Sequence, residues 1–366
     1  MSEYNPGTPW RRSPQEVVAG LTSWVVHTFG PESDVVDAHS PENGMSSETL
    51  LFSVRRADHV ERYVARLAPQ ADVFPVFATY DLELQKRCMD IVGEKTNLPV
   101  PAVPYYEADT VWLGVPFLVM GRIDGVTPPD MPPYVFGSWL MELPAEDQAD
   151  FQRNAVAVLA ELHTITPANT DLSFLQRPDL GDTPLAQQIG FQRWYYEWAR
   201  EGDSYPLIER TFAWLDAHMP PESPAVLNWG DSRIGNMLWQ GTRPVAILDW
   251  EMATVGPPEI DLSWMIFLHR FFQNLAVRYG FPGMPDFMER AEMIATYESI
   301  SGHSVQNLEW FEVFSALRFA IVSVRTSARG IAYGTAEKPA DPDDLIMFRD
   351  LLEMMLDGSY WGQPAA

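Results

Sequence analysis

The spacing of apolar residues predicts an amphipathic helix near the start of the chain, followed by β-strands. Residues 17–25 place their apolar side chains on one helical face, and Pro14 suits the first turn of such a helix. The runs 50–54 and 62–67 are rich in apolar and β-branched residues, which favours extended structure. Ahead of the first run, the segment 41–49 holds Pro, Asn, Gly and Ser residues that are typical of turns. We expect this segment to join two strands.

A second helical pattern covers residues 82–92. It stops before the sequence LPVP at 98–101, because proline cannot continue a helix. The apolar run at 111–120 predicts one or two strands, and the proline-rich segment behind it indicates a boundary. We therefore expect two parts, residues 1–125 and residues 126–366.

Beyond this boundary the apolar spacing is mainly helical. Two short runs, 237–239 and 244–248, look extended and predict a single hairpin. The prediction is therefore an α+β chain whose first part is mixed and whose second part is helical apart from that hairpin. Helices are predicted at 151–162, 191–198, 207–215 and 311–322.

Composition narrows the classes of function. The chain has 366 residues, and its 25 Lys and Arg face 50 Asp and Glu, which gives a formal charge of -25. This charge repels phosphate backbones and anionic lipids, so neither nucleic acid nor a membrane surface is an expected partner. Cys88 is the only cysteine and cannot close an intramolecular disulfide. With no export signal in residues 1–12, the prediction is a cytoplasmic protein of unspecified oligomeric state.

The residues best suited to chemistry lie around the predicted hairpin, in the sequences NWGDSRIGN at 228–236 and AILDWE at 246–251. Phosphoryl transfer needs one carboxylate to orient an attacking hydroxyl, and an amide oxygen with a second carboxylate to hold Mg²⁺. Asp231, Asn236 and Asp249 supply these groups in that order. Asp and Asn are also common in turns. The ordered set nevertheless favours the chemical interpretation.

These motifs resemble the aminoglycoside phosphotransferase family, and the DWE run resembles a subgroup similar to the kinase-like domains fused to some acyl-CoA dehydrogenases. The resemblance implies a two-lobed protein-kinase-like fold, with a small β-rich nucleotide-binding N-lobe and a larger, mainly helical catalytic and substrate-binding C-lobe. By this resemblance Asp231 is the catalytic base, and Asn236 and Asp249 bind Mg²⁺. Asp261 is similar to a family aspartate that braces the catalytic loop, although it could equally cap a helix.

The resemblance also assigns a nucleotide-binding set in the N-terminal part. The loop at 43–49 is similar to the family's phosphate-covering loop, in which glycine permits close backbone approach and hydroxyl groups meet phosphate oxygens. Other members of the set hold the phosphates or lie where the chain crosses between the two lobes and contacts adenine. The expected residues are Gly44, Ser46, Ser47, Thr49, Arg66, Met120 and Ile123.

The chain departs from the family pattern at three places. Trp229 stands where the family usually has His, and Arg66 stands where it has a phosphate-binding Lys. Arg can also bind phosphate bidentately. The helical Glu that pairs with that Lys aligns best with Gln85, with Glu83 nearby.

We therefore expect a small-molecule kinase that transfers the γ-phosphoryl group of ATP or GTP to a substrate hydroxyl. The departures leave open a nucleotide-binding pseudokinase with a sensing or scaffolding role. A serine hydrolase would require Ser232 to be a reactive nucleophile, although its setting is one residue too long for the usual Gly-x-Ser-x-Gly turn. By the same resemblance, an aromatic group lies in the acceptor region: Trp194, Tyr195, Tyr196 and Trp198.

Overall fold

The structure is a computed structural model that describes residues 14–40, 48–57, 59–70 and 73–362. Its contacts divide the chain into two compact units. The first unit comprises Met1–Ile91, Pro101–Ile123 and Thr326–Glu337, and the second comprises Val92–Val100, Asp124–Arg325 and Lys338–Ala366. Each unit is therefore completed by segments that are distant in sequence.

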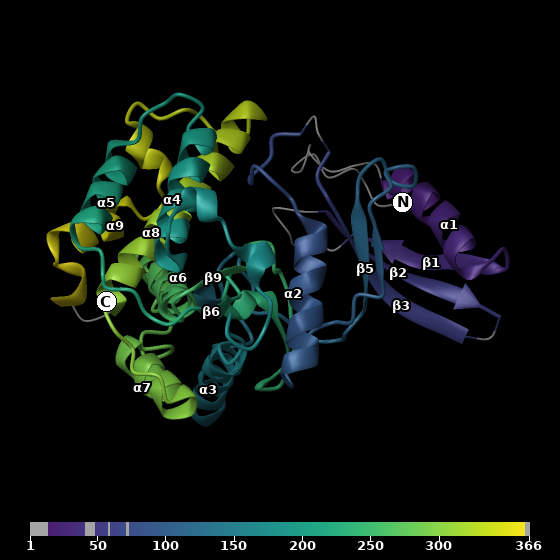
Figure 1. The fold of residues 1–366 in the computed structure, drawn as a ribbon, viewed down its shortest axis with the longest axis horizontal. Coiled ribbons are helices and arrows are strands. Elements are labelled where there is room, and N and C mark those ends of the chain that lie inside the picture. The colour runs from purple at the N-terminus through teal and green to yellow at the C-terminus, as the bar shows by residue number, and fades with distance from the viewer. Residues whose placement is uncertain (1–13, 41–47, 58, 71–72, 363–366) are drawn as a thin grey trace. The chain divides into compact units, whose positions relative to one another are not determined.

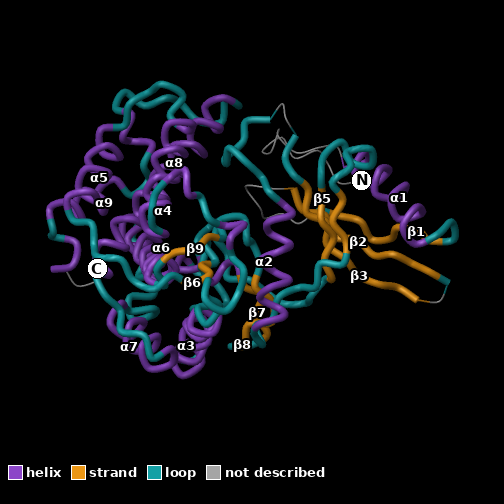
Figure 2. Tube along the Cα trace, in the orientation of Figure 1, coloured by secondary structure: helices purple, strands orange, loops and turns teal. Residues whose placement is uncertain are grey.

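The first unit is built on a five-stranded antiparallel sheet, of which Figure 1 labels β1, β2, β3 and β5. The strand order is β1-β2-β3-β5-β4. The helices of this unit are α1 and the greater part of α2 (Figure 2), together with the last turns of a helix from the second unit. The elements are α1 (Pro14–Phe29), β1 (Ser33–His39), β2 (Glu48–Arg56), β3 (His59–Leu67), α2 (Leu82–Lys95), β4 (Tyr105–Glu107) and β5 (Phe117–Gly121).

One face of this sheet forms the hydrophobic core of the first unit with α1. Alternate residues of a strand point to the same face, and Leu50, Ala65 and Val119 are directly opposite one another across β2, β3 and β5. Leu21 and Trp24 of α1 belong to the same core cluster. The predicted first helix and the strands that follow it are confirmed.

The prediction of strands across residues 111–120 is wrong in its first half. A turn occupies residues 110–113, and extended structure begins only at Phe117. Leu113 and Val115 are apolar because they enter the core from this turn, and Gly114 has a left-handed φ of 72° that a regular strand does not allow. Hydrophobicity alone does not distinguish a buried turn from a buried strand.

The second unit is mainly helical. The four helices predicted from apolar spacing are confirmed as parts of α3, α4, α5 and α8. The last turns of α8 belong to the first unit. Its helices are α3 (Ala145–Leu162), α4 (Pro184–Ala199), α5 (Pro206–Ala217), α6 (Glu259–Arg278), α7 (Arg290–Ser301), α8 (Leu308–Ala332) and α9 (Arg349–Asp357), with short 3₁₀ helices η1 (Tyr134–Phe136), η2 (Ser173–Leu175), η3 (Pro178–Leu180), η4 (Ile234–Asn236), η5 (Pro342–Leu345) and η6 (Tyr360–Gly362).

Two strand pairs organise the middle of this unit. The predicted hairpin is confirmed as β7 (Met237–Gln240) with β8 (Arg243–Ile247). The expectation of a single hairpin is wrong, because β6 (Val226–Asn228) also pairs with β9 (Thr254–Gly256). Each of these missed strands has three residues, too few to show an alternating pattern.

The described part of the chain contains no helix long and apolar enough to cross a membrane. The α+β organisation expected from the sequence, with an antiparallel sheet in the first unit and a larger helical second unit, is confirmed.

Candidate active site

The segment 228–236 runs from the end of β6 through η4 and carries Asp231. Both oxygens of the Asp231 side chain accept hydrogen bonds. Oδ1 accepts from Trp264 Nε1 at 2.8 Å, and Oδ2 accepts from Arg233 Nε at 3.0 Å and from Asn236 Nδ2 at 2.6 Å. The carboxylate is held from two sides while 15% of the side-chain surface stays exposed.

The surroundings of Asp231 favour its charged form. Burial by itself would raise the pKa of this carboxyl group. The positive charge of Arg233 and three hydrogen bonds outweigh that effect and hold the pKa of Asp231 below its usual value. Arg233 is in turn paired through Nη1 with Asp130 Oδ2, so one guanidinium group bridges two carboxylates. Asp231 is therefore an ionised group at neutral pH.

Asp261 in the first turn of α6 anchors the backbone ahead of Asp231. Its Oδ2 accepts a hydrogen bond from the backbone N–H of Trp229 at 2.7 Å, and its Oδ1 accepts one from that of Gly230 at 2.8 Å. The Ser232 hydroxyl donates to the Asp261 carbonyl at 2.7 Å. These three hydrogen bonds tie the loop to the first turn of α6.

His163, the C-cap residue of α3, also contacts Asp261. Its Nε2 lies 3.2 Å from Asp261 Oδ2, and its Nδ1 lies 2.7 Å from the Tyr297 hydroxyl. The cap of α6 is Pro258, so the alternative that Asp261 caps this helix is wrong. Asp261 instead acts on the loop that carries Asp231.

Ser232 is fully buried, and its hydroxyl hydrogen is used in the bond to Asp261. A nucleophilic serine needs access to its substrate and a base that accepts its proton. The serine hydrolase alternative therefore has no support in this geometry.

Gly230 and Trp229 shape the turn before Asp231. Gly230 has a φ of 90°, and a Cβ atom at this position would lie 1.9 Å from the Met252 carbonyl oxygen. The Trp229 indole N–H donates to the carbonyls of Leu248 and Asp249 at 2.8 and 3.1 Å. Although Trp replaces the family's usual His, this side chain links the Asp231 loop to the segment that carries Asp249.

Asn236 and Asp249 lie on two segments that are joined through their backbones. The Leu248 N–H donates to the Asn236 carbonyl at 2.9 Å, and Asp249 adopts a left-handed φ of 62° just after it. Because Nδ2 of Asn236 faces Asp231, the amide oxygen is directed away from that carboxylate. The amide oxygen and the Asp249 carboxylate are hard donors that suit Mg²⁺.

No cluster of three or more His, Cys, Asp or Glu side chains that could hold a metal ion occurs among the described residues. A site with one amide oxygen and one carboxylate as ligands has fewer protein ligands than such a cluster. It fits Mg²⁺, which usually takes only one or two protein carboxylates and completes its shell with phosphate oxygens and water.

The residues expected on the nucleotide side lie in the first unit. Arg66 of β3 is directly opposite Thr49 of β2, so the two share the face of the sheet that points away from the α1 core. Met120 is in β5, and Ile123 follows that strand. The remaining members of the set, Gly44, Ser46 and Ser47, lie outside the described residues.

The two α2 residues expected as candidate partners of Arg66 differ in burial. Gln85 is buried in α2, whereas Glu83 is exposed on the same helix. Arg66 itself is buried, with 8% of its surface accessible. Of the two candidates, only the uncharged Gln85 is buried as Arg66 is.

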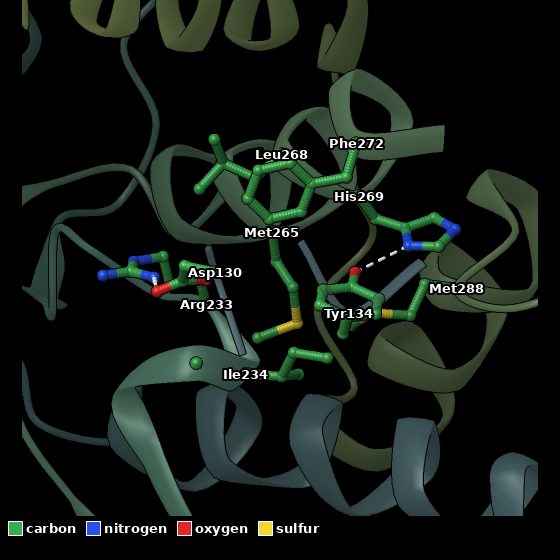
Figure 3. Close-up of a pocket in the computed structure, with 10 residues that line it drawn as sticks. Asp130, Tyr134, Arg233, Ile234, Met265, Leu268, His269, Phe272 and Met288 are labelled. Atoms are coloured by element: carbon green, nitrogen blue, oxygen red, sulfur yellow. Dashed lines mark hydrogen bonds and ion pairs between the residues drawn. The ribbon is translucent and has the colours of Figure 1, made fainter. Parts of the chain in front are cut away.

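A small cavity lies beside η4, on the side where Arg233 meets Asp130 (Figure 3). Met265 extends between that ion pair and a second pair formed by Tyr134 and His269. His269 Nδ1 lies 2.7 Å from the Tyr134 hydroxyl and Nε2 lies 3.2 Å from the Met284 carbonyl. Since a carbonyl only accepts, Nε2 carries the hydrogen, and Tyr134 donates to Nδ1.

Sequence reasoning did not single out four residues around Asp231. Arg233 lies two residues after Asp231 and Trp264 lies three residues after Asp261, the spacing that shares a helix face. These positions could have been found from the motif. Asp130 and Arg318 reach the loop from segments about 90 to 100 residues away, and no local signal indicates them.

The aromatic group expected near the acceptor lies on α4. Tyr195 and Tyr196 are buried, whereas Trp194 is 41% exposed. The Tyr195 and Trp198 rings stack with their centroids 5.8 Å apart. Of this group, Trp194 presents the largest accessible aromatic surface.

Comparisons with known proteins show which family and which fold this chain resembles. A profile of the Phosphotransferase enzyme family matches residues 41–289. The chain is 25% identical to acyl-CoA dehydrogenase family member 10 from Mus musculus over 312 residues, which are 81% of this chain and 26% of the mouse protein. The chain thus spans about a quarter of the length of that relative.

Two solved structures share the fold. A candidate aminoglycoside phosphotransferase from Ralstonia eutropha has a TM-score of 0.65 at 22% identity, covering 93% of this chain and 97% of the other. A thermostable variant of aminoglycoside phosphotransferase APH(4)-Ia, in a ternary complex with AMP-PNP and hygromycin B, has a TM-score of 0.55 at 17% identity, covering 92% and 98%. The family resemblance and the kinase-like fold expected from the sequence are confirmed.

Proposed function

The chain belongs to the Phosphotransferase enzyme family, and on this premise we propose that it transfers the γ-phosphoryl group of ATP or GTP to a hydroxyl group of a small molecule. The observation that carries this proposal is Asp231, a largely buried carboxylate that is held ionised and still 15% exposed. A general base needs both properties, because it must be charged and must reach the proton it accepts.

The proposed reaction is a direct transfer. The acceptor oxygen bonds to the γ-phosphorus while the bond from that phosphorus to the bridging oxygen breaks and releases the nucleoside diphosphate. The hydroxyl proton passes to Asp231 during this step. Arg233 and Asn236 keep the carboxylate oriented toward the acceptor, since both donate to Oδ2.

Asn236 and Asp249 are the proposed ligands of Mg²⁺, which when bound neutralises phosphate charge. Their oxygen donors support this assignment, as does the backbone bond between their segments. The nucleotide-binding role of the first unit is also a proposal. Its expected residues remain Gly44, Ser46, Ser47, Thr49, Arg66, Met120 and Ile123.

The proposed acceptor is a hydroxylated small molecule. A phosphotransferase of the same fold binds AMP-PNP and hygromycin B in one complex, which supports the pairing of a nucleoside triphosphate with a small polyhydroxylated acceptor. The acyl-CoA dehydrogenase relatives contain this region as a minor part of a longer chain. Their names therefore carry no assignment of the acceptor.

The binding-only alternative is the nucleotide-binding pseudokinase, which binds a nucleotide without transferring phosphate. It rests in part on Trp229. The hydrogen bonds from this indole to Leu248 and Asp249 favour an intact catalytic loop, so they weaken that alternative. A phosphorylation screen separates the two functions. The purified protein is incubated with Mg²⁺ and γ-labelled ATP or GTP and with pools of hydroxylated metabolites and aminoglycosides.

The proposal predicts a phosphate ester formed in equal amount with the nucleoside diphosphate for at least one pool. Tight nucleotide binding without transfer to any acceptor would instead support the binding-only alternative.

A further inference from the structure

The two oxygens of the Asp231 carboxylate are not equivalent. Each carboxylate oxygen has about two lone-pair sites for hydrogen bonds. Among the described residues, Oδ2 accepts from both Arg233 and Asn236, whereas Oδ1 accepts from Trp264 alone. One acceptor site is thus left, and it is on Oδ1.

We propose that Trp264 is a positioning residue that presents Oδ1 of Asp231 as the atom that receives the proton of the acceptor hydroxyl. This inference rests on the proposed function and adds to it the reacting oxygen and the side chain that orients it. The acceptor hydroxyl then approaches beside the edge of the Trp264 indole.

Trp264 is suited to this role because its own position is fixed. The side chain is 3% exposed and lies on α6, three residues after Asp261, so the same helix face holds both the loop backbone and the Asp231 carboxylate. The Phe319 ring packs against the indole edge to face with centroids 6.1 Å apart. The indole N–H can therefore point in one direction only.

Arg318 of α8 supports the indole from one face. Its guanidinium carbon lies 4.3 Å from the centroid of the Trp264 ring, and Nη2 donates to the Gly230 carbonyl at 2.6 Å. The side chain is buried, and among the described residues its Nη1 has no hydrogen-bond partner. A buried cation with an unused donor lowers stability, and burial lowers the pKa of Arg318 to about 10. Its placement is better explained by the support of Trp264 and Gly230 than by stability.

Other buried tryptophans use their indole differently. Trp239, Trp250 and Trp310 donate to backbone carbonyls at 3.1, 3.2 and 3.0 Å. Such bonds satisfy a buried donor without touching a reacting group. Trp310 offers a matched control, because it is 3% exposed and its indole N–H donates to the Leu215 carbonyl rather than to Asp231.

The first test needs no acceptor. The full chain is labelled with ¹⁵N at the indole nitrogens of its 13 tryptophans, and the Nε1–H signals are recorded in the wild type, in Asp231→Asn and in Trp264→Phe. The signal missing in Trp264→Phe should move upfield in Asp231→Asn, because an amide oxygen deshields the indole proton less than a carboxylate. The Trp310 signal should stay in place.

If Trp264→Phe does not fold, Trp229→Phe identifies the indole signal of the other tryptophan in this loop. Movement of a signal other than that of Trp229 in Asp231→Asn supports the contact, and unchanged positions of all other indole signals would overturn the proposal.

The second test uses an acceptor from the screen. Trp264→Phe keeps a ring for Arg318 but removes the donor, so kcat should fall about 10- to 100-fold, the range expected for one lost hydrogen bond to a charged group. The acidic limb of the kcat/KM profile should move to higher pH. Trp310→Phe should leave that limb unchanged.

A limb that stays in place in Trp264→Phe would show that Trp264 only fills the core and would overturn the inference. The proposed function fails in a different way, namely when Asp231→Asn keeps wild-type turnover although the Trp264 signal has moved.

Discussion

At the scale of single residues, Arg233 controls the charge of the proposed base. Its guanidinium lies between Asp231 and Asp130 and lowers the pKa of Asp231 against the opposing effect of burial. A base works only when it is deprotonated, so activity should be lost as the pH falls through the pKa of Asp231. The lower this pKa is, the wider the range of pH over which the enzyme stays active.

Replacing Arg233 with Met removes this charge and should raise the pKa of Asp231. The acidic limb of kcat/KM should therefore move to higher pH, by an amount of the order of one pH unit for each 1.4 kcal/mol of lost interaction. Arg153→Met is the control, because the Arg153 side chain is 65% exposed and pairs with Asp150 on the surface of α3. An acidic limb that does not move in Arg233→Met would contradict the role given to this charge.

At the scale of elements, the turn between β6 and η4 depends on Gly230. An Ala at this position has a φ of 90° and a Cβ atom 1.9 Å from the Met252 carbonyl, so the loop must move. A displacement of about 1 Å at a catalytic group can lower kcat about 10²-fold. We expect a loss of that size for Gly230→Ala.

Gly241 provides the matched control, because its φ is 59° but nothing lies within 4 Å of an added Cβ atom. Gly241→Ala should cost about 1 kcal/mol of stability from the left-handed backbone and leave kcat close to that of the wild type. Steady-state kinetics and thermal unfolding of both variants measure the two effects. Equal losses of kcat would argue against a specific role of the Gly230 turn.

His269, in the middle of α6, makes the stability of the fold depend on pH. Burial lowers the pKa of His269 to about 4, whereas an unfolded histidine titrates near 6.5. Because the folded pKa is the lower one, the unfolded chain binds the proton first as the pH falls. The stability from neutral His269 is complete above about pH 6.5 and is lost progressively between about 6.5 and 4, in total about 3 kcal/mol.

Denaturant unfolding at several pH values measures this loss. His269→Gln retains hydrogen-bonding groups but cannot titrate, so its free energy of unfolding should fall less between pH 6.5 and 4 than that of the wild type. His218→Gln, at an exposed position, should behave like the wild type. The same slope in all three proteins would be inconsistent with a neutral, buried His269.

Elements with a clear apolar period could be predicted from the sequence, and those without one could not. The core face of α1 has helical spacing and was identified with its first turn at Pro14. The apolar residues at 111–116 wrongly predicted a strand, because a turn places Leu113 and Val115 in the core. β6 and β9 are visible only through their pairing with each other, which is a tertiary contact.

At the scale of the whole molecule, the proposed chemistry combines a nucleotide, Mg²⁺ and an acceptor. Nucleotide affinity should therefore be about tenfold or more higher with Mg²⁺ than with EDTA, a difference of at least 1.4 kcal/mol. Asp249→Ala should remove most of this difference. Calorimetric titration of ATP into both proteins measures it.

The control for this titration is Asp216→Ala, because the Asp216 side chain is 54% exposed and pairs with Arg193 on the surface. It should keep the full effect of Mg²⁺. An unchanged Mg²⁺ effect in Asp249→Ala would remove Asp249 from the proposed metal site.

The candidate site could be predicted as far as it is local in sequence. Asp231, Asn236 and Asp249 follow one another within 19 residues, and their order carries a chemical meaning. Asp130 contacts Arg233 and Arg318 contacts Gly230, and both arrive from segments distant in sequence. Only folding brings these two groups to the loop, so no motif indicates them.

The separation of turnover from nucleotide binding in Asp231→Asn tests the central claim most directly. Asn keeps the size of Asp231 but cannot accept the proton, whereas the nucleotide is held by other residues in the proposed site. With an acceptor from the screen, kcat should fall by roughly 10² to 10⁴, while the calorimetric Kd for Mg²⁺-ATP stays close to that of the wild type. Wild-type turnover in Asp231→Asn would contradict the claim that Asp231 is the base of a phosphoryl-transfer site.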